Sequence, residues 1–142
     1  IIHSNRVTIV KEKLDIDTMI KASRFLLGEK DFSSFRASRC QSKTPMRNVR
    51  DIKITKKKNT ITFEISANAF LFNMVRIIMG TLINFGIKKL DPKLMKEILD
   101  AKDRKEASKT FDSCGLYFIG PEYPMVFRLP NSPTRRQIVP YI

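Results

Sequence analysis

The chemistry of this sequence centres on one arginine inside an apolar stretch. Residues 67–86 read ANAFLFNMVRIIMGTLINFG, with Arg76 in the middle of them. A guanidinium is always charged and is rarely buried without a partner, so the sequence raises the question of what Arg76 meets. Helical spacing predicts an enclosed helix with one narrow polar strip, although a half-buried helix whose arginine reaches water fits the periodicity equally well. The strip consists of Asn73, Arg76, Gly80 and Asn84.

A second candidate site is a basic segment between Arg36 and Lys58, in which nine basic residues accompany a single acid, Asp51. Serines and threonines lie among them and can hydrogen-bond phosphate oxygens. The whole chain carries 27 Lys and Arg against 14 Asp and Glu, a formal net charge of +13. Clustered positive charge predicts a polyanionic partner, most simply nucleic acid. An anionic membrane surface and a merely solvated basic hairpin are the alternatives.

Two phenylalanines, Phe32 and Phe35, flank the start of this basic segment. Phe32 and Phe35 could stack on a base or anchor the segment in the core, and core anchoring is the better interpretation of each ring taken alone. The residues that we expect to bind RNA are Arg36, Arg39, Lys43, Arg47 and Phe35.

Metal and redox chemistry find little support in the sequence. The two cysteines, Cys40 and Cys114, form no CxxC pattern, and His3 is the only histidine. We therefore expect free thiols, no metal, and a cytoplasmic protein. Asparagines and Arg76 make residues 67–86 a poor membrane span, so we expect no membrane partner.

The elements that must position these residues follow from periodicity and capping signals. Their order, β-α-β-β-α-(α)-β, predicts an α+β fold of the ferredoxin-like, split β-α-β kind, an antiparallel sheet with helices on one face. That fold hosts enzymes and RNA-binding modules alike and so names no function. The expected elements are a strand at 6–10, a helix from the Asp15 cap to about Leu27, a polar loop at 29–45, strands at 48–56 and 60–68 joined by a turn at 57–59, helices at 70–85 and 91–102, and a strand at 115–119.

The domain organisation that we expect is simple, because 142 residues suit one domain. Residues 1–13 form an N-terminal strand and interdomain segment, and residues 14–124 form the α+β domain. Residues 125–142 read as an irregular tail, since prolines are concentrated there.

Four segments of the sequence, taken in order, resemble one known family. DFSSFRASRCQSKTP, ANAFLFNMVRIIMGTL, LDAKDRKEASKT and GLYF with EYP are similar to the C-terminal half of the tRNA pseudouridine synthase A family, from about Leu14 to Pro124. The resemblance implies a pseudouridine synthase C-terminal domain that acts, without cofactor or metal, on uridines at positions 38–40 of the tRNA anticodon stem-loop. One departure is the segment from Thr110 to Leu116, where the family usually has a Thr-Ala-Pro turn.

The same resemblance assigns roles to two residues. Arg76 would pair with the catalytic aspartate of an Arg-Thr-Asp segment, and Leu116 would form an apolar wall of the uridine pocket. This sequence contains no Arg-Thr-Asp, so we expect the C-terminal part of a longer enzyme, inactive alone, whose partners are its own N-terminal domain and a second subunit of a homodimer. Arg76 would then lack a partner within this chain and lie on a concave, partly exposed surface near Leu116. The alternative is a non-catalytic basic RNA-binding module of ferredoxin-like fold.

Overall fold

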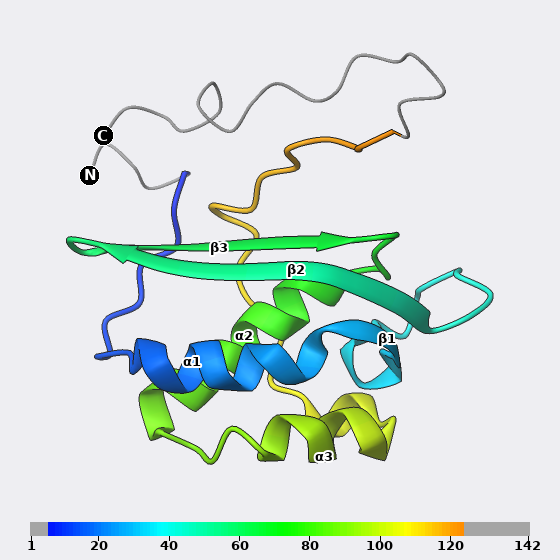
Figure 1. Ribbon diagram of the computed structural model, residues 1–142, viewed down its shortest axis with the longest axis horizontal. Helices are drawn as coiled ribbons and strands as arrows, with labels where there is room; N and C mark the ends of the chain where they lie inside the picture. Colours follow the sequence, from blue (N-terminus) through cyan, green and yellow to red (C-terminus); the bar gives the residue numbers. More distant parts are fainter. Residues whose placement is uncertain (1–5, 124–142) are drawn as a thin grey trace. The chain divides into compact units, whose positions relative to one another are not determined.

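A computed structural model describes residues 6–123 of the chain. The chain divides into two units, one of residues Thr8–Ser113 and the other of Ile1–Val7 with Cys114–Ile142. The helices and strands of the described part all belong to the larger unit, in the order α1, β1, β2, β3, α2 and α3 (Figure 1).

Helix α1, Ile16–Ser23, begins where the sequence predicts because Asp15 caps it. The Asp15 carboxylate accepts the backbone N–H of Thr18 at 3.1 Å, which satisfies one of the free amides of the first turn. The same hydrogen bond holds the pKa of Asp15 below its usual value. A 3₁₀ turn, Arg24–Leu26, extends the helix. The buried residues of α1 are Met19, Ala22 and Ser23.

The sheet is antiparallel, with the strand order β1-β2-β3. Strand β1 spans Gly28–Asp31, β2 spans Met46–Lys57, and β3 spans Thr60–Ala67. Lys58, with φ 53°, makes the predicted hairpin turn between β2 and β3. The register gives each face of the hairpin its own character, since directly opposed residues share a face. The apolar pairs are Ile52–Ile65 and Ile54–Phe63, and the polar pairs are Lys53–Glu64 and Thr55–Thr62.

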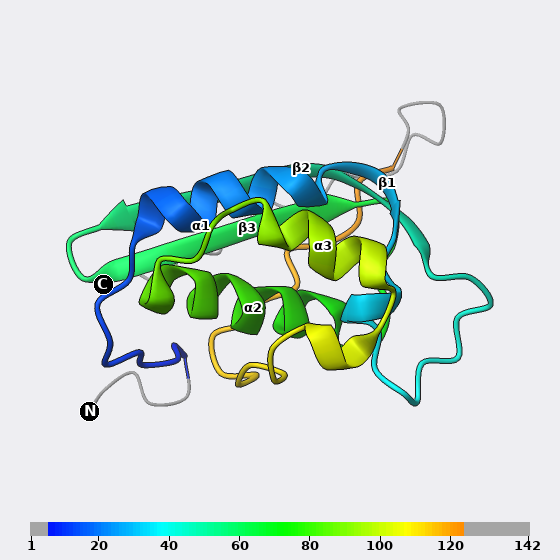
Figure 2. The same ribbon diagram turned by 90° about the horizontal axis from the view of Figure 1, so that it is seen from below.

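The helices form a layer beneath this sheet. Helix α2 spans Met74–Lys88 and α3 spans Leu94–Ala101. All three helices lie on one side of the sheet (Figure 1), and from below they cover β2 and β3 (Figure 2). The core therefore lies between helices and sheet, and the α+β class is confirmed. Its fully buried side chains include Met19, Leu26, Phe32, Phe35, Met74, Ile77, Ile78, Leu82, Phe85 and Met95.

The expected polar loop at 29–45 is wrong in its first part, because Gly28–Asp31 pairs with β2 as strand β1. A 3₁₀ turn, Ser33–Phe35, follows it. The sequence GEKD has little intrinsic preference for a strand, so the neighbouring strand decides its conformation.

The expected start of the apolar helix at residue 70 is also wrong, since α2 begins at Met74. Asn73 adopts a left-handed conformation with φ 59°, which no helix interior accepts. The Phe72 backbone bonds to a neighbouring loop in place of a helical turn: its N–H donates to the Cys40 sulfur, and its carbonyl accepts the Ala37 N–H.

The expected strands at 6–10 and 115–119 do not form in the described chain. An apolar run becomes a strand only where a neighbour supplies a backbone ladder, and the described sheet ends at β1 and β3. In the smaller unit, the Tyr117 hydroxyl instead donates to the carbonyl of Arg6 at 2.7 Å. Among the described residues, no helix is long and apolar enough to cross a membrane. Residues 125–142, expected to be an irregular tail, lie outside the described range.

Candidate functional site

Arg76 lies on the first turn of α2 and is held by two acceptors. Its Nε donates to the carbonyl oxygen of Phe111 at 2.8 Å, and its Nη1 donates to Oδ1 of Asn73 at 3.1 Å. The Phe111 N–H in turn donates to the Arg76 carbonyl at 3.1 Å, so the two residues are joined in both directions. The guanidinium is therefore fixed in orientation before any ligand arrives.

The expectation that Arg76 has no partner within this chain is wrong. Both of its acceptors, however, are neutral oxygens, so its positive charge is oriented without being neutralised by them. Nη2 makes no hydrogen bond to a residue of the described range, and the side chain is only partly buried. A guanidinium has five donors in a planar fork, so a further carboxylate or phosphate oxygen can still bind it.

Gly80 brings the Phe111 carbonyl to Arg76. A Cβ at Gly80 would lie 2.3 Å from the carbonyl oxygen of Lys109 and 3.5 Å from the Phe111 nitrogen. Only a residue without a side chain lets the segment from Lys109 to Phe111 lie against α2 one turn after Arg76. The close neighbour that Gly80 allows is therefore this backbone segment.

Arg104 binds this segment and the two residues before it, a role that the sequence did not predict. Its Nη1 donates to the carbonyls of Ala107 and Ser108, and its Nη2 donates to the Thr110 hydroxyl at 3.3 Å. The N–H of Ser108 also donates to the hydroxyl of Thr81 on α2, at 3.1 Å. The signal was available in LDAKDRKEASKT, one of the four family-like segments, where Arg104 follows the end of a helix.

Two of the predicted RNA-binding arginines, Arg36 and Arg47, bind the backbone and side chains of the loop between them, which we call the basic loop. Arg36 donates through Nη2 to the carbonyls of Cys40 and Ser42. Arg47 donates through Nη1 to the carbonyls of Thr44 and Met46, and through Nη2 to the Ser42 hydroxyl at 3.0 Å. These hydrogen bonds support an internal role for both guanidinium groups.

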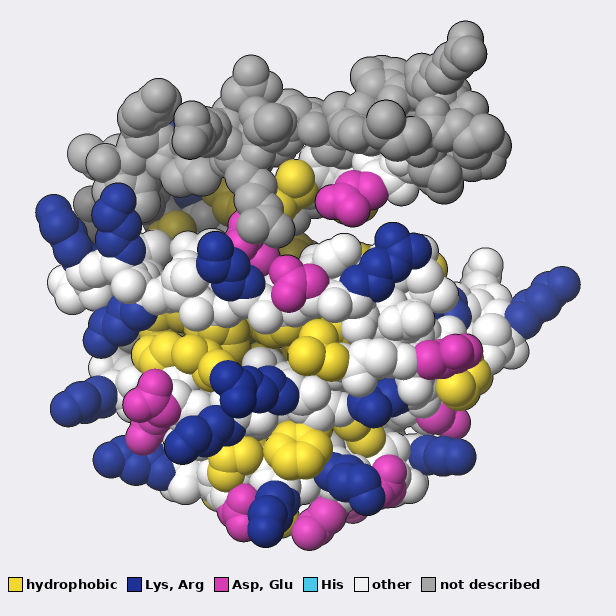
Figure 3. Space-filling view, in the orientation of Figure 1, with side chains coloured by type: hydrophobic (Ala, Val, Ile, Leu, Met, Phe, Trp, Pro, Cys, Tyr) yellow, Lys and Arg dark blue, Asp and Glu magenta, His cyan; other side chains and the backbone are white. Residues whose placement is uncertain are grey.

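The other two predicted cations, Arg39 and Lys43, are exposed on this loop. They are the members of the predicted set that present a free charge to solvent. Figure 3 shows that Lys and Arg side chains do not form one continuous patch on the face drawn there, since they are spread over the described part with acidic side chains among them.

Phe35 is buried with 0% of its side chain exposed, as is Phe32, and the two ring centroids lie 6.1 Å apart. In this structure neither ring offers a face to a base, so Phe35 does not serve as the expected RNA contact. The core-anchoring interpretation of both rings is confirmed.

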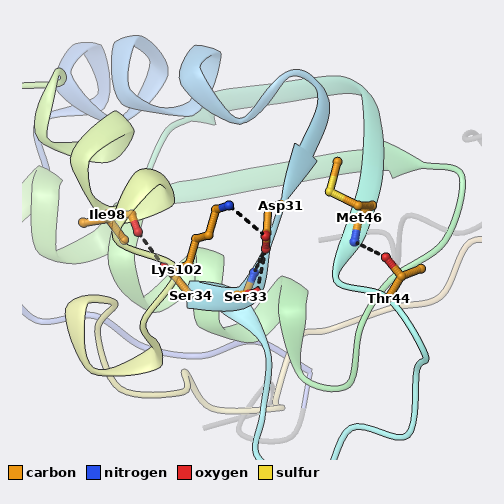
Figure 4. Close-up of polar contacts among 7 residues, drawn as sticks. All are labelled: Asp31, Ser33, Ser34, Thr44, Met46, Ile98 and Lys102. Carbon is orange, nitrogen blue, oxygen red and sulfur yellow. Dashed lines mark hydrogen bonds and ion pairs between the residues drawn. The ribbon is translucent and has the colours of Figure 1, made fainter.

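The DFSS segment is fastened by polar contacts drawn in Figure 4. Asp31 accepts the N–H of Ser33 at 2.9 Å and its hydroxyl at 2.6 Å, and Lys102 lies 3.6 Å from the same carboxylate. Burial alone would raise the pKa of Asp31, but these contacts outweigh burial, and the pKa lies below its usual value. The Ser34 hydroxyl donates to the carbonyl of Ile98 on α3 at 2.6 Å. These contacts therefore hold in place the residues from which the loop after Phe35 extends.

Cys40 connects the loop to the segment before α2. Its sulfur accepts the N–H of Phe72 at 3.4 Å. This hydrogen bond, with further ones from Ser42 and Arg36, lowers the pKa of the thiol to about 6. The thiol is therefore largely ionised at neutral pH.

The main hollow does not include Arg76, and the described residues contain no cluster suited to a metal ion. A shallow hollow of ≈510 Å³ involves Leu14, Ile87 and Lys89, at the opposite end of α2 from Arg76. Residues 6–123 hold no group of three or more His, Cys, Asp or Glu side chains placed to bind a metal ion. The arrangement around Arg76 can orient and stabilise an anion, because the two acceptors described above are neutral oxygens.

The larger unit is thus an α+β domain with a pre-oriented arginine and an exposed basic loop. A protein-family model described as tRNA pseudouridine synthase matches residues 22–124. This match, with the relatives described next, places the chain in the tRNA pseudouridine synthase A family, and the resemblance found in the sequence is confirmed.

Two relatives show how much of such a protein this chain represents. The tRNA pseudouridine synthase A of Francisella tularensis subsp. novicida (strain U112) is 48% identical over 112 residues, which cover 79% of this chain and 43% of the relative. That of Aliivibrio salmonicida (strain LFI1238) is 47% identical over 132 residues, which cover 93% of this chain and 50% of the relative. The chain spans about half the length of the curated relatives it matches.

Proposed function

We propose that this chain is the C-terminal domain of a tRNA pseudouridine synthase, which isomerises uridine to pseudouridine in the tRNA anticodon stem-loop. The chain would contribute the pocket arginine and part of the RNA-binding surface. The observation that carries the proposal is the guanidinium of Arg76, held in a fixed orientation by two neutral acceptors in a member of this family.

The role of Arg76 follows from the acceptors that it already has. Phe111 and Asn73 occupy Nε and Nη1 and set the plane of the guanidinium. A catalytic aspartate, carried by a segment outside this sequence, would bind the remaining donors. Burial in a closed pocket raises the pKa of a carboxylate and favours its neutral form, whereas an adjacent guanidinium lowers the pKa and keeps the carboxylate ionised. The ionised carboxylate would then take part in the isomerisation, in which the uracil is detached from C1′, turned and rejoined to C1′ through carbon.

Leu116 would supply an apolar wall for the uracil ring, and no metal or cofactor would take part. Arg39 and Lys43 would bind tRNA phosphates, while Arg36 and Arg47 would hold their loop in shape. An N-terminal domain and a second copy of the enzyme would complete the binding surface, and the α+β domain would be of the ferredoxin-like kind.

The test compares two variants of the complete reading frame that encodes this chain. Arg76→Met removes the proposed pocket charge, whereas Lys88→Met removes an exposed charge at the other end of the same helix. Arg76→Met should abolish pseudouridine formation in a tRNA transcript while tRNA binding stays within about threefold of wild type, since phosphate contacts supply most of the affinity.

Lys88→Met should leave the activity unchanged. Full activity of the Arg76→Met enzyme would refute the role of Arg76. Pseudouridine formed by the 142-residue chain alone would refute the assignment of the aspartate to another segment. RNA binding by a complete protein that forms no pseudouridine would favour the non-catalytic module.

A further inference from the structure

Phe72 is an exposed aromatic residue on a fixed backbone. Its side chain is 55% exposed. Its N–H donates to the Cys40 sulfur at 3.4 Å, and its carbonyl accepts the Ala37 N–H at 3.3 Å. Both the backbone N–H and the carbonyl of Phe72 are therefore hydrogen-bonded to the basic loop. A single exposed phenylalanine is ordinary, but one that is tethered in this way is held in place at a cost in chain entropy.

The position of Phe72 lies between the two parts of the candidate site. On one side it precedes Asn73, whose side chain accepts a hydrogen bond from Arg76. On the other side its backbone bonds to Ala37 and Cys40, which flank the exposed Arg39. An exposed aromatic residue is thus carried on backbone that adjoins Asn73 on one side and contacts the loop of the exposed cation on the other.

A partner for this surface must combine negative charge with flat apolar groups. Single-stranded or looped RNA has both, because phosphates bind cations while unpaired bases stack on aromatic rings. A second copy of this chain is a poorer match, since a net charge of +13 makes like surfaces repel each other. We propose that Phe72 stacks on an unpaired base of the RNA that Arg39 binds through its phosphates. This inference rests on the proposed function and adds a base contact to it.

The test uses the absence of tryptophan from the chain. Phe72→Trp would be the only tryptophan, and stacking on a base should quench its emission. The matched control is Ile87→Trp, at another exposed apolar position, near the far end of α2. The α2 helix of 15 residues is about 20 Å long, so the two probes are well separated.

Each single-tryptophan chain is titrated with an anticodon stem-loop RNA and, separately, with inorganic polyphosphate, which has charge but no bases. We expect the stem-loop to quench Phe72→Trp strongly and Ile87→Trp hardly at all, and polyphosphate to quench neither. Equal quenching by polyphosphate, or none by bound RNA, would overturn the stacking proposal. A change of emission with protein concentration alone would favour a protein contact and would also overturn it.

Affinity provides the second measurement. Phe72→Leu keeps apolar bulk without a π-face and should weaken binding by roughly 5- to 100-fold, whereas Phe72→Tyr should restore it. The salt slope of binding should stay unchanged in Phe72→Leu, because stacking releases no counterions. Unchanged affinity of Phe72→Leu would refute stacking and leave RNA binding intact. If the wild-type chain binds no RNA at all, both the stacking proposal and the proposed contribution of this chain to the RNA-binding surface fail.

Discussion

Replacing Arg76 by methionine should destabilise this chain. The substitution keeps most of the side-chain length and removes the two hydrogen bonds, to the Phe111 carbonyl at 2.8 Å and to Asn73 Oδ1 at 3.1 Å. A hydrogen bond from a charged donor contributes about 1.5–3 kcal/mol to stability, and a partly buried carbonyl left unpaired costs about 1 kcal/mol or more. Since Arg76 is partly exposed and methionine packs well, we expect a net loss of about 2 kcal/mol.

Urea unfolding of the 142-residue chain, followed by circular dichroism, measures this loss. At an m-value of about 1–3 kcal/mol/M, a loss of about 2 kcal/mol lowers the midpoint by roughly 1 M. Arg76→Lys should give an intermediate loss, because one ammonium cannot reproduce the planar fork. Lys88→Met, at an exposed position of the same helix, should stay within about 0.5 kcal/mol of wild type. An unchanged or higher midpoint for Arg76→Met would refute the view that the two acceptors stabilise this chain.

Three further outcomes follow from the site. Gly80→Ala should lower the urea midpoint although alanine favours helices, because its Cβ would meet a backbone carbonyl 2.3 Å away. Gly86→Ala should lower the midpoint less, because its Cβ meets the flexible end of a methionine side chain at 2.8 Å. A larger loss for Gly86→Ala than for Gly80→Ala would refute this. With the other cysteine replaced by serine, ultraviolet absorbance should show the Cys40 thiol titrating at a pKa of about 6, not 9.0. Because the pKa of the folded state is the lower one, the thiolate should make the free energy of unfolding rise with pH between about 6 and 9, and a flat profile in this window relative to Cys40→Ser would contradict that. Arg39→Ala and Lys43→Ala should each flatten the log–log salt dependence of tRNA binding by about 0.7–0.9, and an unchanged slope in the double variant would place the phosphate contacts elsewhere.

The four cations of the basic segment differ in what their removal would disturb. By sequence, Arg36 and Arg47 are equivalent to Arg39 and Lys43, since all are cations in a polar stretch. In the structure, Arg36 and Arg47 donate to carbonyls of their own loop, so their removal would disturb the loop as well as the charge. Only the exposed pair tests phosphate binding without that complication.

Local rules predicted the elements whose causes are local. Asp15 caps α1, Lys58 turns the β2–β3 hairpin, and the alternation of β3 gives one half-buried apolar face. Capping, turn geometry and periodicity act over a few residues, so they can be read along the chain. Local rules failed for β1 and for the start of α2, where hydrogen bonds to distant segments set the backbone.

The sequence by itself determined the class of the fold and the family, and it singled out Arg76 as a charge in an apolar stretch, because composition, period and the four family-like segments are properties of the chain alone. Of the two acceptors of Arg76, Asn73 lies on the polar strip that the sequence shows, whereas the tertiary structure alone decided the other. That acceptor is the main-chain carbonyl of Phe111, which lies 35 positions along the chain and approaches only because Gly80 has no side chain. A backbone carbonyl is common to every residue and leaves no mark in the sequence, so only the packing of α2 against that segment could reveal it.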